Sequence, residues 1–161
     1  MGRLACGLLA AAMVLAGASA LRAQPVDRHE GYYYPKVSSH ETYVSRARVM
    51  DDSDRGRRIA FVSGLTQQLS DLPYAPTYAV FAKGGEADRL IIVAYGEGQF
   101  NTLYRARALF ASLTALARLT PLFRDLQVED LFTFFDLAKL LGFRSITISD
   151  GDKFAHQVEL K

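Results

Sequence analysis

Apolar residues recur every three or four positions in three stretches of the chain, and each stretch predicts an amphipathic helix. The first stretch, from Ile59 to Leu72, follows a run of candidate capping residues at 51–54. Pro73 comes directly after it and would end the helix, because proline lacks the N–H that the next turn needs. This spacing predicts one face directed toward a core.

The second and third stretches predict two more helices in the second half of the chain. The second opens at Asn101 or Thr102, either of which can cap it, and runs toward Pro121, which ends or kinks it. The third covers Val128 to Leu141, with Leu131 among the residues expected to face inward. Gly142 follows and is suited to a left-handed C-cap.

Four runs rich in β-branched and aromatic residues predict two hairpins, which turn at Gly84-Gly85 and at Asp150-Gly151. Residues 90–94 are apolar at every position, which is typical of an interior strand. The predicted strands are 77–82, 89–95, 145–149 and 154–160, and a short edge strand can form over 41–49. Together these elements predict an α+β fold with a largely antiparallel sheet of about four to five strands and about three helices packed on it.

Residues 1–20 have the pattern of a cleavable signal peptide. Arg3 supplies a positive start, Leu4 to Ala20 contains no charge, and the run closes on Ala18-Ser19-Ala20. The apolar run is shorter than the ~20 residues of a membrane span. We therefore expect a periplasmic or secreted protein, with a signal peptide at 1–20, an N-terminal arm at 21–50 and a single α+β domain at 51–161.

Composition narrows the chemistry of the mature protein. Cys6 is the only cysteine, so cleavage would leave no disulfide, no thiolate nucleophile and no cysteine ligand for zinc. The net charge of +2 would fall to about +1 with the loss of Arg3, which gives no electrostatic reason to expect nucleic acid as a partner. Contact with a membrane is expected only during export. The arm carries Tyr32-Tyr33-Tyr34, which we expect to cover the domain surface or to meet a partner.

His156 is the residue most suggestive of a site. Alternation along the last predicted strand places it on the same face as Val158 and Leu160, so it should be half-buried and need a hydrogen-bond partner. Asp136, Asp150 and Asp152 are conceivable neighbours. The candidate pocket is therefore His156 with Asp150 and Asp152, and the alternative is a purely structural histidine.

Other motifs have simpler interpretations. Residues 96–98, Gly-Glu-Gly, lie where phosphate-binding loops occur, but a third glycine is absent and a strand-to-helix turn explains them. Asp150-Gly151-Asp152 lacks the ligand count of a calcium loop and suits a hairpin turn. The pairs His29-Glu30 and His40-Glu41 do not have helical zinc spacing, so no metal is expected. The remaining charged candidates are helix arginines, expected on solvated surfaces rather than at an anion site: Arg55, Arg57, Arg58, Arg105, Arg107, Arg118 and Arg124. The first three follow acids at 51–54 and are expected to pair with them at the helix start.

Most of the mature stretch resembles a small family of exported bacterial proteins. The resembling segments are 53–55, 61–68, 81–84, 102–109 and 133–160. Such proteins are sometimes labelled molybdopterin-guanine dinucleotide biosynthesis protein A, a nucleotidyltransferase that transfers GMP from GTP. The resemblance implies a nucleotide loop, and Gly17 and Arg22 match that loop, with GTP and Mg²⁺ as cofactors. Ala18 replaces its second glycine, and its Met-Gly and Lys are absent.

Two functions from different classes follow from these patterns. The first is an exported binding or accessory module without a cofactor, whose partner is an unknown protein or small molecule. The alternative is an enzyme, either the GTP-dependent nucleotidyltransferase of molybdenum cofactor biosynthesis or a hydrolase built around His156. The fate of residues 15–17 separates the nucleotidyltransferase from the exported module, because a cleaved signal peptide cannot also hold a nucleotide.

Overall fold

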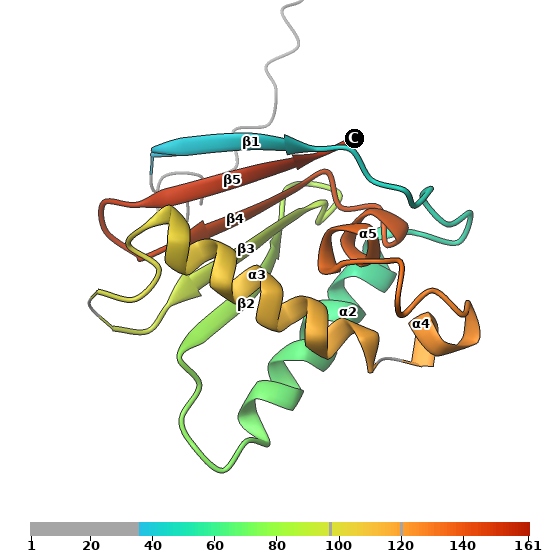
Figure 1. Cartoon of the computed structure of the whole chain (residues 1–161), viewed down its shortest axis with the longest axis horizontal. Helices are drawn as coiled ribbons and strands as arrows, with labels where there is room; N and C mark the ends of the chain where they lie inside the picture. The colour runs from blue at the N-terminus through green and yellow to red at the C-terminus, as the bar shows by residue number, and fades with distance from the viewer. Residues whose placement is uncertain (1–35, 97, 120) are drawn as a thin grey trace, which may run out of the picture.

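The computed structural model describes residues 36–96, 98–119 and 121–161. Within them five strands form one sheet in the order β1-β5-β4-β3-β2 (Figure 1). The strands are β1 (Ser39–Tyr43), β2 (Tyr78–Lys83), β3 (Arg89–Ala94), β4 (Ser145–Ser149) and β5 (Ala155–Leu160). The predicted α+β fold is confirmed.

The sheet is mixed. The two predicted hairpins, β2/β3 and β4/β5, are antiparallel, whereas β3/β4 and β1/β5 are parallel pairs. Parallel neighbours need a long crossover connection, and the helices between β3 and β4 provide it. Strand β3 lies between β4 and β2, and Leu90, Ile91 and Ile92 have no exposed surface, so the prediction of an interior strand is correct.

The helices of the described chain are α2 (Arg55–Ser70), α3 (Leu103–Arg118), α4 (Pro121–Asp125) and α5 (Phe134–Leu140). Figure 1 shows α2, α3 and α5 on one side of the sheet. Asp54 caps α2 by accepting a 2.6 Å hydrogen bond from the Arg57 backbone N–H. Thr102 caps α3 in the same way through Arg105 N–H. Both caps lie at the predicted helix starts.

The core lies between this helical layer and the sheet. The sheet contributes alternate residues of the inner strands, such as Ile92, Ile148 and Val158, which are fully buried. Leu65 of α2 and Leu113 of α3 cover them from the helical side. The predicted hydrophobic stripes of the helices are thus the surfaces that cover the sheet.

Two predicted elements have different bounds in the structure. The edge strand is Ser39–Tyr43 rather than 41–49, because its partner β5 ends at Leu160, opposite Tyr43. The third helix begins only after Thr133, since residues before it form turns that include the left-handed Gln127 (φ 54°). Leu131, expected to face inward, is therefore 60% exposed.

The end of α5 meets the start of α2 around a buried arginine. Gly142 adopts φ 79°, and its N–H and that of Phe143 bond to the carbonyls of Lys139 and Ala138, which is the expected left-handed C-cap. Arg58 lies beside it and is only 6% exposed, which corrects the expectation of a solvated side chain. Its Nε donates to the Glu86 carbonyl at 2.9 Å, so it joins α2 to the β2–β3 turn.

Candidate functional site

His156 is at the centre of a polar cluster between β1 and β5. It is 1% exposed, so it is more deeply buried than the predicted half-buried histidine. Its Nδ1 lies 2.8 Å from Ser39 Oγ. Its Nε2 lies 3.3 Å from Glu41 Oε1, at ion-pair distance, and makes no aligned hydrogen bond to a described residue. The imidazole is therefore held between a hydroxyl and a carboxylate.

The register of two strands produces this arrangement. In the parallel β1/β5 pair, Ser39 lies opposite His156 and Glu41 lies opposite Val158. Alternate residues of a strand point to the same face, so Ser39 and Glu41 both project to the face that carries His156. The backbone N–H of Ser38 bonds to the Ala155 carbonyl at 2.9 Å, which secures the start of β1.

Glu41 is held on its second oxygen by helix α3. Arg107 Nη2 donates to Glu41 Oε2 at 2.9 Å. Burial raises the pKa of Glu41, but the Arg107 hydrogen bond and the contact with His156 outweigh it, so the pKa lies below its ordinary value. Glu41 is thus an anion beside the imidazole, and Arg107 is tied to the edge strand rather than lying on a purely solvated surface.

This charge arrangement orients the imidazole proton. A carboxylate beside Nε2 favours the tautomer that carries its proton on Nε2, which leaves the Nδ1 lone pair free to accept the Ser39 hydroxyl proton. The assignment follows from the partners of the two nitrogens. Hydroxyl, imidazole and carboxylate in this order can polarise the hydroxyl oxygen toward a nucleophile.

The three aspartates named as neighbours of His156 make their contacts elsewhere. Asp150 Oδ1 accepts from the backbone N–H groups of Asp152 and Phe154, both at 2.9 Å, and so closes the hairpin turn. Asp136 accepts from Ser45 and other donors at the other end of β1. The structure therefore does not bring Asp150 and Asp152 together with His156 as one pocket.

Asp150 and Asp152 instead face the glycine-containing loop that follows β3. They line a hollow of about 900 Å³ together with Gly96 and Gly98. The loop carbonyl of Gly98 accepts a hydrogen bond from Arg105 of α3, which also donates to Asn101 Oδ1. In the described part of this region, Arg105 therefore stabilises the loop through a hydrogen bond, and the two aspartates line the same hollow as the loop.

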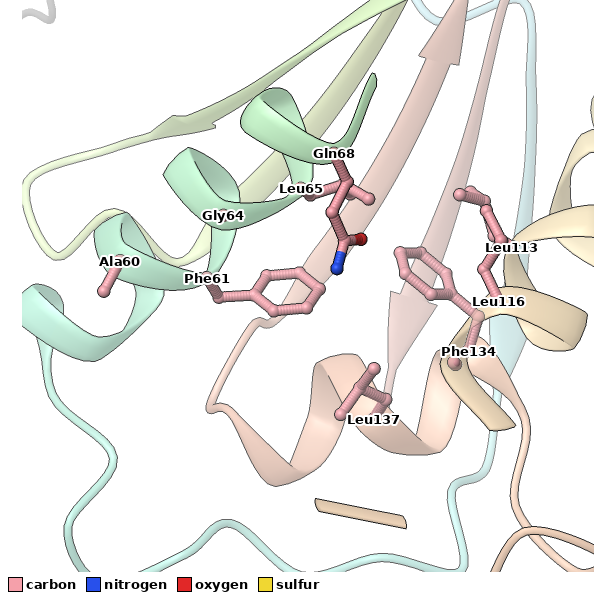
Figure 2. A pocket seen from close by; sticks show the side chains of 10 residues that line it. Ala60, Phe61, Gly64, Leu65, Gln68, Leu113, Leu116, Phe134 and Leu137 are labelled. Atoms are coloured by element: carbon pink, nitrogen blue, oxygen red, sulfur yellow. The ribbon is translucent and has the colours of Figure 1, made fainter. Parts of the chain in front are cut away.

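A separate, apolar pocket opens between α2 and the pair α3/α5, shown in Figure 2. It has a volume of about 200 Å³. Phe134 of α5 and Leu113 of α3 form its floor with 2% and 1% exposure, and Phe61 of α2 faces them. The remaining lining residues are Ala60, Gly64, Leu65, Gln68, Leu116, Ala117 and Leu137.

One polar group marks the mouth of this pocket. Gln68 is exposed, and Figure 2 shows its amide directed into the space between Phe61 and Phe134. Gly64 lies one helical turn before it, and a Cβ added there would meet no atom within 4 Å. Small-molecule sites combine an apolar lining with few polar groups, and this pocket has that composition.

Sequence reasoning found His156 but missed its partners and the apolar pocket. Both partners lie in the predicted N-terminal arm, where Ser39 precedes the expected edge strand 41–49 and Glu41 is its first residue. The spacing Ser39-x-Glu41 would identify them as partners of His156 only if the pairing of the two strands were known. Ser39 and His156 are 117 residues apart in the sequence. Phe61, Leu116 and Phe134 have the hydrophobic spacing of ordinary core residues, so nothing in the pattern singles them out.

Several sequence-based candidates lie outside the described residues. They include the signal segment, the tyrosine arm at 32–34, the pair His29-Glu30, and Gly17 and Arg22 of the implied nucleotide loop. His40 is described, is exposed, and lies opposite Gln157 on the sheet face away from Glu41. Among the described residues there is no group of three or more His, Cys, Asp or Glu side chains suited to a metal ion. None of the described helices has the length and apolar character to cross a membrane.

Comparison of the chain with protein-family profiles, with curated proteins and with solved structures gives no match in any of the three. A functional assignment therefore depends on the geometry of the polar cluster around His156 and of the apolar pocket beside Phe134.

Proposed function

We propose that this protein is an exported binding module whose apolar pocket between α2 and α3/α5 takes a small aromatic molecule. The observation that carries the proposal is an apolar cavity of about 200 Å³ between α2 and the pair α3/α5. Cavities of ~150 Å³ with leucine, isoleucine and phenylalanine linings bind benzene-sized molecules. Phe61 and Phe134 offer ring contacts, which favours an aromatic ligand over a linear one.

The position of Gln68 supports a ligand with one polar edge. Its exposed amide, at the mouth of the pocket, can donate or accept a single hydrogen bond. The rest of the lining is aliphatic or aromatic, so a charged ligand would lose hydration without compensation. An aromatic ring with one N–H or O–H group matches this distribution.

Indole is a suitable probe because the chain contains no tryptophan, so its fluorescence has no background from that residue. Titration of the purified protein should give a saturable blue shift as indole enters the pocket. The Gly64→Leu variant, whose side chain would fill the open space beside the helix, should lower the affinity at least tenfold. Gly64→Ala is the matched control and should bind almost as well as the parent. Absence of saturable binding, or equal binding by Gly64→Leu, would contradict the proposal.

The export part of the proposal is supported by the pattern of residues 1–20. Determining the N-terminal residue of protein recovered from the native cell envelope tests it directly. A start at or near Leu21 is expected. A start at Met1 in cytoplasmic protein would contradict export and would favour GTP binding by Gly17 and Arg22.

A further inference from the structure

We propose that Ser39, His156 and Glu41 form a nucleophilic site that hydrolyses small carboxylic esters. This goes beyond ligand binding and uses a different part of the molecule from the apolar pocket. Ser39 Oγ lies 2.8 Å from His156 Nδ1, within the hydrogen-bond range expected between a nucleophile and its base. Glu41 Oε1 lies 3.3 Å from the other ring nitrogen.

The three side chains have the roles of an acyl-transfer triad. The roles depend on geometry rather than on the order of the residues along the chain. Ser39 is the nucleophile, and the residue is half-buried on the edge strand. His156 is the base, and its burial fixes the ring. Glu41 is a positioning residue, since it acts on substrate only through the imidazole.

A purely structural histidine would explain the burial but not the charge around it. His156 Nε2 has less than 1 Å² of exposed surface and no aligned hydrogen bond in the described chain, yet it faces an anion that Arg107 keeps in place. Such an arrangement stabilises an imidazolium, which is the species formed when the ring takes a proton from Ser39. The electrostatic stabilisation of the ring by Glu41 is therefore greatest during proton transfer, when the ring carries a positive charge.

Two hollows lie beside neighbours of Ser39 along β1. Ser38, one residue before it, lines the hollow that contains Gly96 and Gly98. Glu41, two residues after it, lines a smaller hollow of about 290 Å³ with Phe110 and Phe135.

The reaction balances with water as the only co-reactant. Ser39 Oγ bonds to the acyl carbon as its proton passes to His156 Nδ1, and the carbonyl electron pair moves to oxygen. The pair returns as the ester C–O bond breaks, and the alkoxide leaves with the proton from Nδ1. Water then attacks the acyl-serine in the same way, which releases the carboxylic acid and restores Ser39.

A fluorophosphonate probe tests this assignment, because it reacts preferentially with activated serine hydroxyls. Incubation with the purified protein, followed by peptide mass spectrometry, should place the label on Ser39. Ser39→Ala should abolish labelling, while Ser63→Ala, which removes an exposed serine of α2, should leave it unchanged. The same pair of variants should separate for p-nitrophenyl acetate hydrolysis, with turnover lost only in Ser39→Ala.

Variants of His156 and Glu41 must be tested by a measurement that a loss of stability alone would not change. A folded His156→Gln variant should label at least ~100-fold more slowly, the usual contribution of a positioned base. Glu41→Gln should slow the labelling of Ser39, and Glu41→Asp should restore part of the rate because it keeps the carboxylate. A merely structural glutamate would change stability and leave the labelling rate unchanged. Thermal unfolding checks that each variant is folded.

An unlabelled Ser39 in the folded parent protein, or equal ester turnover by Ser39→Ala, would overturn the proposal. Indole binding by the pocket beside Gly64 is measured separately, so failure of one proposal is distinguishable from failure of the other.

Discussion

The Ser45 hydroxyl donates a 2.7 Å hydrogen bond to Asp136 Oδ1 across 91 residues of sequence. Asp136 is 1% exposed, and it also accepts from the backbone N–H of Arg46 at 3.0 Å and of Thr133 at 2.9 Å. Tyr43 adds its hydroxyl at 3.0 Å. One carboxylate thus joins the end of β1 to the start of α5, and β1 is the strand that carries Ser39 and Glu41.

Asp136→Asn should lower the free energy of unfolding by about 2–4 kcal/mol, because several hydrogen bonds to a buried charge are weakened together. Chemical denaturation at neutral pH measures the effect. Asp130→Asn, a change at an exposed aspartate in the turn before α5, is the control and should cost less than about 0.5 kcal/mol. Equal effects of the two substitutions would contradict this account of Asp136.

The same carboxylate should make stability depend on pH. Burial raises the pKa of Asp136, but the hydrogen bonds from Thr133, Ser45 and Arg46 outweigh it, so the folded-state pKa lies below the ordinary value. A depressed folded pKa contributes stability above the unfolded-state pKa, and this is lost as the pH falls through the folded value. Unfolding free energy should therefore decrease below about pH 4, with a shallower slope in Asp136→Asn. A slope unchanged by the substitution would argue against this linkage.

Gly142→Ala should destabilise the protein by more than about 1 kcal/mol, the usual cost of a Cβ at a left-handed position. The added Cβ would also lie 2.5 Å from Ser53 Oγ and 2.7 Å from Arg58 Nη1. Gly85→Ala is the matched control, since its Cβ would meet no atom within 4 Å. Thermal unfolding of both variants is the measurement, and a similar loss in both would show that crowding at Gly142 is not the cause.

Arg58→Met should cost about 2–3 kcal/mol, because it removes the charged hydrogen bonds that the buried guanidinium donates to the carbonyls of Glu86 and Leu141. Arg57→Met on the same helix removes an exposed pair with Asp52 and should cost less than about 1 kcal/mol. Urea unfolding distinguishes the two variants. A small effect at Arg58 would mean that the buried guanidinium is not needed to join α2 to the β2–β3 turn.

Gly64→Ala should raise the free energy of unfolding by about 0.5–1 kcal/mol, because alanine is the better helix former. Gly64 lies inside α2, and its added Cβ meets nothing within 4 Å. Chemical denaturation checks the gain. A loss of stability would indicate that the pocket wall at Gly64 is more crowded than its geometry shows.

Local signals in the sequence determined most of the helices, both hairpins and the interior strand. Capping at Asp54 and Thr102, and the left-handed Gly142, depend on residues near one another in the chain. Their physical cause is local, since hydrophobic period and capping chemistry act within a few residues. The α+β class followed from the order of these elements.

Tertiary structure alone decided the strand order, the two parallel pairs and the contents of both candidate sites. The turns before α5 and the early end of β1 also depend on partners far away in the chain. Most clearly, the sequence marked His156 as a buried histidine in need of a partner, and pairing of β1 with β5 supplied Ser39 and Glu41 in place of Asp150 and Asp152. Alternation assigns a side chain to a face, but only strand register determines which residue lies opposite it.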